Sequence, residues 1–577
     1  MTTIIIPLCL AWPLVLALAV LGWPNAVIRA LLPWAPLPLL VAVLLGVPQF
    51  DAAWLLPGAR LGVDEISAVL IPAMTTLWLA AGLVAHHYLP PDRRRDHFFV
   101  WFLLAMTGNL VLLCALDAVL FYLGFAVMSF ASYGLVVHSG SERARHAGRY
   151  YIVLVILGEI SILSGLLMLG SRGEIEFVAM QAALDNGDES GNSLIMALLI
   201  VGFGIKAGLI GLHFWLPLAH PVAPAPASAV LSGAMIKAGA LAWLRLFPLG
   251  ESALPDWGLL LVVAGLTTAA YGVLVGLCQR ESKTVLAYSS VSQMGLISMA
   301  VGLGLMFPQA WPALLAAILI YIVHHGLIKG SLFLGAGLVA HALKPLTAGL
   351  ARIVLVAGAL ALAAGPLTGG VVAKSALAQA VGEGDGPLRI WIPNLLLVSS
   401  VLTALLMVRF LYIAWPRADV DAEPTPVGLL VPWLALAGLG LAWPWWLAEA
   451  ELRQYVLALG TQWNALWPIL VAAGIAAGAH ALNRRTRMPA VPGWPAGDLG
   501  IALEKGVIRM GCWINDFCRQ TLPHLRDGLP SIVLAMLAPS NPWPRRLKVT
   551  ESYLQLWTVT ASLFILLAIA LAWLLVG

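Results

Sequence analysis

Continuous apolar runs of about 20 residues follow one another along most of this chain, and about 20 residues is the length that an α-helix needs to cross a hydrocarbon core. Strands of a membrane barrel would instead alternate apolar and polar residues. Only 10% of the 577 residues are charged, against about 25% in soluble domains. The sequence therefore predicts an all-α polytopic membrane protein.

Apolar windows of about 17–25 residues define sixteen predicted transmembrane spans. They are 4–22, 30–48, 65–87, 98–115, 117–137, 150–170, 194–212, 223–247, 257–278, 284–306, 311–341, 350–381, 391–415, 427–448, 464–482 and 553–576. The two long runs, 311–341 and 350–381, are expected to contain broken helices. The first run lacks a basic region and a cleavage site, so we expect a span rather than a removable signal peptide.

The predicted loops alternate in charge. Loops after odd-numbered spans hold basic clusters such as 93–95 and 484–487, whereas loops after even-numbered spans hold acids such as Asp185, Asp188 and Glu189. Because basic loops remain cytoplasmic, both termini are predicted on the non-cytoplasmic side. The net charge of +4 is too small to indicate nucleic acid, and the five cysteines show no metal-ligand spacing.

The segment 483–552 differs from the rest because it mixes charged and apolar residues. Its spacing predicts an amphipathic helix along the membrane surface, followed by a terminal span in 553–577. A cytoplasmic loop with one helical stretch is the alternative. The chain has no GxGxxG after a strand and no cysteine cluster, so no cofactor and no catalytic chemistry are expected in the chain itself.

Five ionisable residues interrupt otherwise apolar spans: Glu159, Lys206, Lys237, Lys329 and Lys374. Each charge at membrane depth costs at least about 2.5–3.5 kcal/mol. Static ion pairs do not explain the set, because four lysines face one acid, although one or two lysines could anchor helix ends. Buried lysines in a hydrated cavity can exchange protons, so the set predicts a proton relay.

Two of these lysines lie beside predicted helix breaks. Lys206 is followed by Pro217 and Pro221, and Lys374 is preceded by Pro366 and several glycines. Broken helices at membrane depth are tolerated where they line a cavity, and a pair of them indicates a transporter built of inverted repeats.

Histidines occur close to the same lysines. His325 lies one helical turn before Lys329, so the two side chains share a face, which makes His325 a candidate relay member. His213, His220 and His324 are accessory candidates. A lone buried histidine is more often a hydrogen-bonded core residue.

Four segments together resemble a known family. They are WLPLAHPVAPAPASAVLSGAMIKAGALAWLR, ESKTVLAYSSVSQMGLI, HHGLIKGSLFLGAG and GPLTGGVVAKSAL. These are similar to the antiporter-like proton-channel subunits of respiratory complex I, Mrp-type sodium/proton antiporters, membrane-bound hydrogenases, formate hydrogenlyase and an inorganic-carbon uptake system. The resemblance covers about 70–415, and the sixteen-span plan resembles the complex I subunit-5-like branch.

The resemblance implies two inverted five-helix repeats, 98–248 and 257–415, between N-terminal helices in 1–97 and further helices in 427–482. It also implies a hydrophilic axis of Lys, His and Glu in the membrane plane. By motif position, Lys206 matches the broken-helix lysine of the first half and Lys374 the terminal lysine of the second. Lys237 and Lys329 match the bridging lysines, and His325 matches the adjacent histidine.

One position departs from the family pattern. The family usually has a glutamate seven residues before a Ser-Tyr pair, and this glutamate partners the first lysine. Counting back from Tyr133, that position is Ala126. We expect Glu159, one span later, to supply the missing carboxylate to Lys206.

The predicted function is that of a proton-translocating membrane subunit of a larger complex in the bacterial inner membrane. Its expected partners are other membrane subunits, the lipid bilayer and protons, with Na+ exchange as an open variant, and no nucleic acid. The complex would be NADH:quinone oxidoreductase-like, hydrogenase-like or Mrp-type. The alternatives are a membrane partner that supplies a proton gradient to a carbonic-anhydrase-like enzyme and, because of Ala126, a non-pumping scaffold.

Overall fold

The computed structural model describes residues 4–51, 58–171, 175–186, 189–382, 388–486, 494–498, 500–501, 506 and 509. Residues up to Ala496 form one compact unit, to which the following description applies. The predicted terminal span 553–577 lies outside the described residues, as does most of the predicted surface segment 483–552.

The described part of this unit is helical except for one small hairpin, in which β1 (Phe50–Asp51) pairs antiparallel with β2 (Arg60–Leu61). The helices are α1 (Ile5–Gly22), α2 (Ala26–Leu31), α3 (Leu37–Leu44), α4 (Glu65–Tyr88), α5 (Arg93–Cys114), α6 (Ala118–Val136), α7 (Glu142–Gly170), α8 (Phe177–Asn186), α9 (Glu189–Ala207), α10 (Trp215–Val222), α11 (Ala225–Val230), α12 (Lys237–Leu246), α13 (Pro255–Leu277), α14 (Ser282–Met306), α15 (Trp311–Leu338), α16 (Pro345–Leu362), α17 (Gly369–Gly382), α18 (Leu388–Ile413), α19 (Val427–Leu447), α20 (Ala450–Leu457) and α21 (Leu459–Thr486). Short turns η2 (Leu32–Trp34), η3 (Leu231–Met235) and η4 (Pro308–Ala310) join some of them.

Thirteen helices among the described residues are long and apolar enough to cross a membrane. They correspond to thirteen of the sixteen predicted spans. The predicted span 30–48 is a pair of helices bent by 42°, and the predicted span 194–212 corresponds to a shorter apolar helix that ends at Ala207. The all-α polytopic membrane fold is therefore confirmed, whereas the count of sixteen and the two inverted repeats stay predictions.

The two long apolar runs behave differently. The expected break within 311–341 is wrong, because α15 is continuous and Pro312 lies in its first turn, where proline costs no helical hydrogen bond. The run 350–381 is broken between α16 and α17. Pro366 lies in this break, and Ala364 and Leu367 there have φ of 60° and 59°, a left-handed conformation that is uncommon for residues other than glycine.

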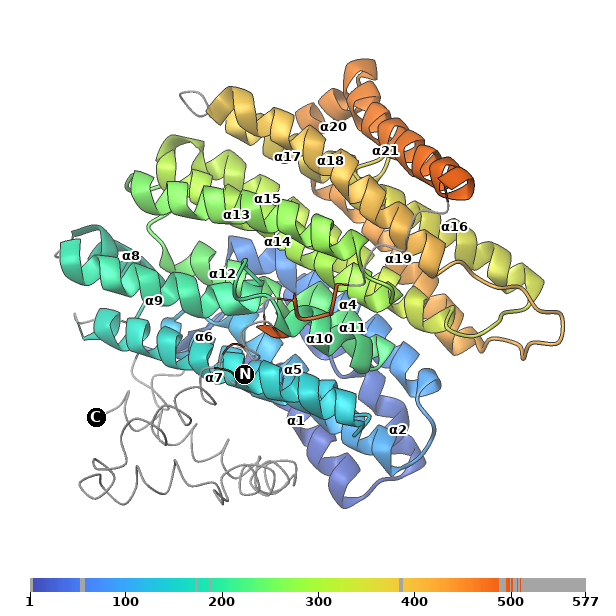
Figure 1. The fold of residues 1–577 in the computed structure, drawn as a ribbon. Coiled ribbons are helices and arrows are strands. Elements are labelled where there is room, and N and C mark those ends of the chain that lie inside the picture. Colours follow the sequence, from blue (N-terminus) through green and yellow to red (C-terminus); the bar gives the residue numbers. More distant parts are fainter. Residues whose placement is uncertain are drawn as a thin grey trace, which may run out of the picture. The chain divides into compact units, whose positions relative to one another are not determined.

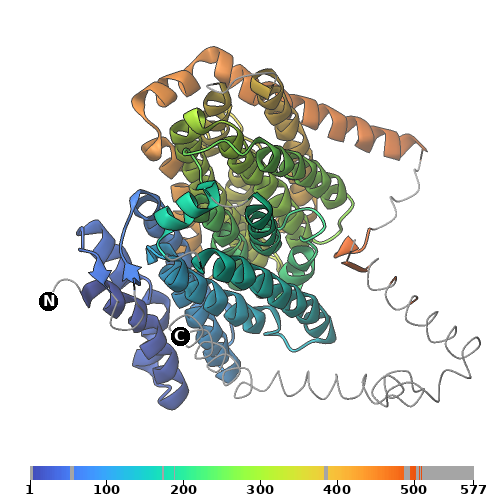
Figure 2. The same cartoon turned by 90° about the vertical axis from the view of Figure 1, so that its left-hand side faces the viewer.

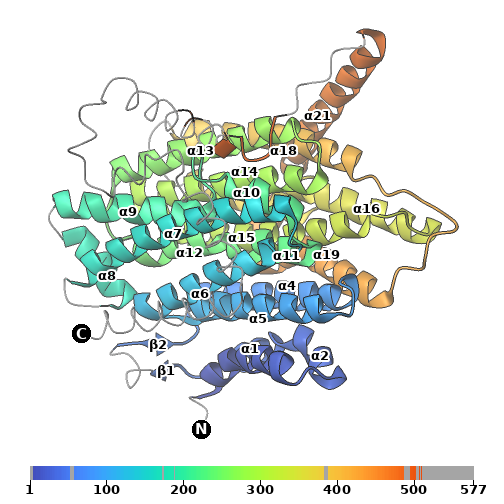
Figure 3. The same cartoon turned by 60° about the horizontal axis from the view of Figure 1, so that its bottom comes forward.

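Helix α15 occupies a central position. It packs against α4, α11, α14, α17 and α19, and most of its side chains are buried. Figure 1 shows α13, α14 and α15 side by side, with α16 to α21 beyond them. The N-terminal helices α1 to α3 lie at the opposite edge, where α1 packs on α5 (Figures 2 and 3). The candidate relay residues thus belong to the interior of the bundle.

Candidate functional site

The helix break after Lys206 is made by glycines. Helix α9 ends at Ala207, and Gly208 and Gly211 take φ of 79° and 80° before α10 begins, a conformation that glycine adopts without steric cost. Pro217 and Pro221 lie inside α10 rather than in the break. The prolines that marked this break in the sequence therefore follow it by several residues.

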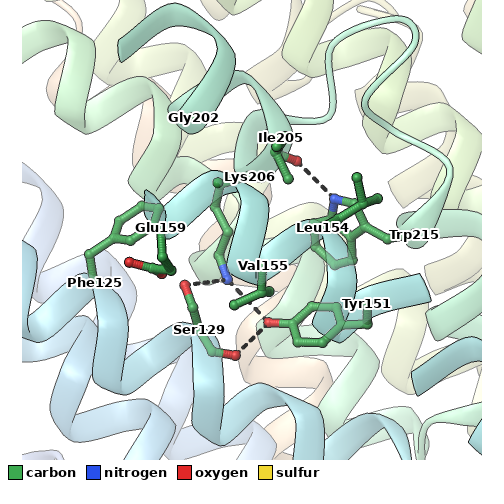
Figure 4. Close-up of a pocket in the computed structure, with 11 residues that line it drawn as sticks. Phe125, Ser129, Tyr151, Leu154, Val155, Glu159, Gly202, Ile205, Lys206 and Trp215 are labelled. Atoms are coloured by element: carbon green, nitrogen blue, oxygen red, sulfur yellow. Dashed lines mark hydrogen bonds between the residues drawn. The ribbon is translucent and has the colours of Figure 1, made fainter. Parts of the chain in front are cut away.

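Neutral groups surround the Lys206 ammonium (Figure 4). Its Nζ donates hydrogen bonds to Ser129 Oγ at 3.2 Å and to the Tyr151 hydroxyl at 3.4 Å. The same nitrogen lies 5.8 Å from each of the ring centroids of Phe125, Tyr151 and Trp215. Aromatic faces attract a cation at this range, so the three rings offset part of the cost of burying the ammonium, and no ion pair with a described carboxylate does so at this distance.

Glu159 lines the same cavity as Lys206, as Figure 4 shows. Its side chain is only 5% exposed, and neither carboxylate oxygen has a hydrogen-bond partner among the described residues. The cavity measures about 10 Å³, which is close to the space that one water molecule needs. Ala126 is buried one helical turn before Ser129, so the carboxylate of this cavity comes from α7 and not from α6.

Lys237 follows a π-helical turn. It is the first residue of α12, directly after η3, and its ammonium donates to the carbonyl oxygen of Ser232 within that turn. The Ser232 hydroxyl lies 2.7 Å from the Ser290 hydroxyl of α14. Turns of this kind inside α-helices occur often at functional sites.

Lys329 and His325 both lie on α15 and are fully buried. The Lys329 ammonium donates to the carbonyl oxygen of Leu286 on α14 at 2.8 Å. Neither ring nitrogen of His325 has a hydrogen-bond partner among the described residues. His324, the next side chain along the helix, is also buried.

Lys374 lies on α17 after the second helix break. Its ammonium donates to Ser400 Oγ of α18 at 2.8 Å. The side chain is 8% exposed, which makes it the most exposed of the four buried lysines.

The four lysines share one arrangement. Each ammonium donates to a neutral oxygen, and no described carboxylate lies within 4.0 Å of any of them. The ion pairs Arg29–Asp96, Arg60–Glu176, Arg143–Glu281 and Arg245–Asp64 each involve an arginine. The alternative of four static Lys–carboxylate pairs therefore does not describe this site.

The two histidines near the first break are buried among aromatic residues. His220 stacks on Phe333 of α15 with centroids 4.5 Å apart, and its ring nitrogens have no hydrogen-bond partner among the described residues. His213 packs edge-on against Tyr271 at 5.2 Å. His220 thus touches the helix that carries Lys329, whereas His213 faces α13.

Sequence reasoning missed the neutral partners. Ser129, Tyr151 and Ser400 bond to the lysines but lie in apolar spans where only charged residues and histidines stood out. For the serine of α18, a signal was present, because Ser400 and Thr403 are three residues apart and therefore share one face of that helix. Among the described residues, no group of three or more His, Cys, Asp or Glu side chains could hold a metal ion.

A second cavity, of about 300 Å³, lies at the end of α12 and is charged. Arg245 of α12 donates to both carboxylate oxygens of Asp64, at 2.7 and 3.2 Å, and to Ser67 Oγ at 2.8 Å. Arg60 and Glu176 form another ion pair at 2.8 Å on the cavity wall. These contacts fix the end of the helix that begins at Lys237.

The fold and the buried lysines define a polytopic membrane protein of the ion-transporting type. The chain belongs to the family described as NADH:quinone oxidoreductase/Mrp antiporter, transmembrane, whose model matches residues 115–403, half of the chain. The resemblance carried by the four sequence motifs is thereby confirmed.

Individual relatives are similar over the same region. Hydrogenase-4 component B of Escherichia coli K12 is 32% identical over 302 residues, which cover 50% of this chain and 44% of the relative. A probable K+/H+ antiporter protein of Rhizobium meliloti 1021 is 30% identical over 295 residues, 49% of this chain and 28% of that protein. The chain thus spans less than half the length of either relative.

The fold also matches a solved complex. The structure of the Mrp complex from Dietzia sp. DQ12-45-1b contains a chain that aligns with a TM-score of 0.74 at 21% identity, covering 92% of this chain and 62% of that one. At this identity the match shows the shared fold. It extends the comparison well beyond residues 115–403.

Proposed function

We propose that this chain is a proton-translocating membrane subunit of a larger energy-coupling complex in the bacterial inner membrane. The observation that carries the proposal is that four lysines, each at most 8% exposed, are held by neutral oxygens in the interior of the bundle. A buried charge without a fixed counter-ion is costly for stability but suits a group that must gain and lose a proton.

In this proposal Glu159 is the carboxylate partner of Lys206. A charge or conformational event in a neighbouring membrane subunit changes the distance between the two groups, and hence the proton affinity of Lys206. The change passes through Lys237, His325 and Lys329 to Lys374, with His213, His220 and His324 as accessory groups. The shared cavity of Glu159 and Lys206 supports the first step.

The proposed setting follows from the loops and the relatives. The basic loops predict cytoplasmic exposure, and on this basis we propose that both termini lie on the opposite side. Protons are the proposed cargo, with Na+ exchange as the open variant. A relative named as a probable K+/H+ antiporter subunit supports testing exchange of a monovalent cation for protons in general. The segments 98–248 and 257–415 are proposed as the two inverted repeats, each containing one broken helix.

The test is proton flux through liposomes that contain the full chain with its copurifying subunits, driven by an imposed potassium diffusion potential. Glu159→Gln removes the charge of Glu159 and keeps its shape. We expect flux to fall by about tenfold or more, as when a general acid or base is removed.

Glu142→Gln is the matched control, because Glu142 lies on the same helix but is exposed in its first turn. It should leave flux unchanged. Unchanged flux in Glu159→Gln would remove Glu159 from the mechanism. Absence of flux in the parent complex would refute proton translocation and favour a scaffold.

A further inference from the structure

Gln293 is a buried polar residue that the proposed relay does not use. It belongs to the segment ESKTVLAYSSVSQMGLI, lies on α14 and is 2% exposed. Both ends of its amide are bonded: the Tyr321 hydroxyl of α15 donates to Oε1 at 2.6 Å, and Nε2 lies 3.4 Å from Thr403 Oγ1 of α18. One side chain therefore links three helices in the bundle interior.

Gln293 is part of a polar face on α14. The carbonyl of Leu286 accepts from Lys329, and the hydroxyl of Ser290 meets Ser232 next to Lys237. Leu286, Ser290 and Gln293 follow one another at spacings of four and three residues, which places them on one side of the helix. This face runs past two of the buried lysines.

The other end of the network reaches the third lysine. Thr403 lies one turn from Ser400 on α18, and Ser400 Oγ accepts the hydrogen bond of Lys374. All three side chains are buried. Polar groups thus extend from the surroundings of Lys329 to Lys374, and the connection between α14 and α18 is made by the amide of Gln293.

An amide differs from the hydroxyl groups around it in what it can do with a proton. The amide oxygen only accepts and the amide nitrogen only donates, whereas a hydroxyl does both. The Tyr321 proton is directed at Oε1, and the amide proton at Thr403. A proton cannot pass along this chain at Gln293, although it could pass along a chain of hydroxyl groups or water.

We propose that Gln293 is a gate between Lys329 and Lys374, closed while its amide bridges Tyr321 and Thr403. The gate opens when the amide moves away from the hydroxyl groups of Tyr321 and Thr403. A group that can both accept and donate a hydrogen bond then takes its place between them. This inference rests on the proposed proton-translocating function, and it assigns Gln293 as a positioning residue of that route.

Two substitutions of opposite chemistry test the gate in the flux assay described above, with the full chain and its copurifying subunits. Gln293→Glu keeps the shape and supplies a carboxyl group that can accept and donate, so flux should rise by about threefold or more. Gln293→Leu keeps the approximate volume and removes every polar atom, so flux should fall by about tenfold.

Ser298→Ala is the matched control, because the Ser298 hydroxyl is also buried on α14 but donates to the Met294 carbonyl oxygen of its own helix. It should leave flux at the parent level. If Gln293→Glu does not assemble, Gln293→Ser makes the same test, since a hydroxyl accepts and donates and leaves room for water; flux above the parent is again expected.

The outcomes separate the gate from the underlying function. If the parent conducts protons and Gln293→Glu and Gln293→Ser conduct them equally fast, the gate is overturned and proton translocation is left intact. Flux that is absent from the parent and from all variants overturns both. Flux that rises in Gln293→Glu and falls in Gln293→Leu supports the gate. A larger deuterium solvent isotope effect on flux in Gln293→Glu than in the parent would locate a proton-transfer step at position 293.

Discussion

Arg245 provides the clearest stability prediction, because its charge is buried at the end of the helix that begins with Lys237. Its side chain is 2% exposed and that of its partner Asp64 is 34% exposed. Arg245→Met keeps the apolar volume and removes the hydrogen bonds to Asp64, to Ser67 Oγ and to the Leu113 carbonyl. The variant isolates what the guanidinium contributes.

The expected magnitude follows from these contacts. Hydrogen bonds to charged groups contribute about 1.5–3 kcal/mol each, and Arg245 makes two of them to Asp64. Water reaches part of Asp64 and solvates it in the variant, and the substitution also relieves the cost of burying the guanidinium. We therefore expect a net loss of about 2–3 kcal/mol.

Thermal unfolding of the solubilised chain, followed by the fluorescence of its 23 tryptophans, measures this loss. A unit of this size has an unfolding entropy of about 1 kcal/mol/K, so the midpoint should fall by about 2–3 °C. Arg352→Met is the comparison, because Arg352 makes a single hydrogen bond, to the Pro416 carbonyl at 3.1 Å, and lies over the Trp415 ring. With fewer charged hydrogen bonds lost, it should shift the midpoint clearly less than Arg245→Met does. Equal shifts in the two variants would refute the reasoning.

Two further predictions concern the yield and the thermal stability of the folded chain. A Cβ atom at Gly370 would overlap the Ala361 carbonyl oxygen, whereas one at Gly382 on the same helix meets nothing within 4 Å. Gly370→Ala should therefore abolish or strongly lower the yield of folded chain, and an unaffected yield would contradict the tight packing of the α16–α17 break. Gly382→Ala should be tolerated. Burial, with a smaller effect of Arg94, lowers the pKa of His138 in the α6–α7 loop. The neutral His138 side chain therefore contributes its full stability to the folded chain above about pH 6.5. This contribution is lost as the pH falls through the lowered pKa. The midpoint of His138→Gln should therefore fall less than that of the parent on acidification, and parallel pH profiles would exclude this role.

The fold was largely predictable because membrane spans carry a strong signal in the sequence. An apolar window of sufficient length has few alternatives to a helix when no water is available to the backbone, and thirteen predicted windows correspond to such helices. The location of breaks was less predictable. Prolines are conspicuous in the sequence, yet the break after Lys206 depends on Gly208 and Gly211, because a reversal at this point needs positive φ.

The candidate site was predictable only in its charged members. Lys206 and Glu159 are visible in the sequence because each interrupts an apolar span. Ser129 is not, because serine hydroxyl groups are tolerated throughout transmembrane helices by bonding to their own backbone. Tyr151 is not, because its ring is largely apolar, and its hydroxyl donates to the Ser129 carbonyl of the neighbouring helix. Which hydroxyl groups turn toward a lysine depends on tertiary packing. The aromatic surroundings of the ammonium were hidden for the same reason, since Trp215 comes from beyond the helix break.

The position of Glu159 on α7 has a mechanical consequence for the proposed relay. Glu159 and Tyr151 lie eight residues apart on one continuous helix, so they share a face and their backbones keep a fixed separation. Lys206 instead lies next to the last residue of α9, directly before glycines that can change conformation. Because Glu159 cannot move relative to Tyr151 without bending α7, we expect the pair to open and close through movement of Lys206 and the adjacent break. Gly208→Ala, at a position where φ is 79°, should then impair flux more than a substitution that removes only the hydrogen bond from the Lys206 ammonium to Ser129 Oγ.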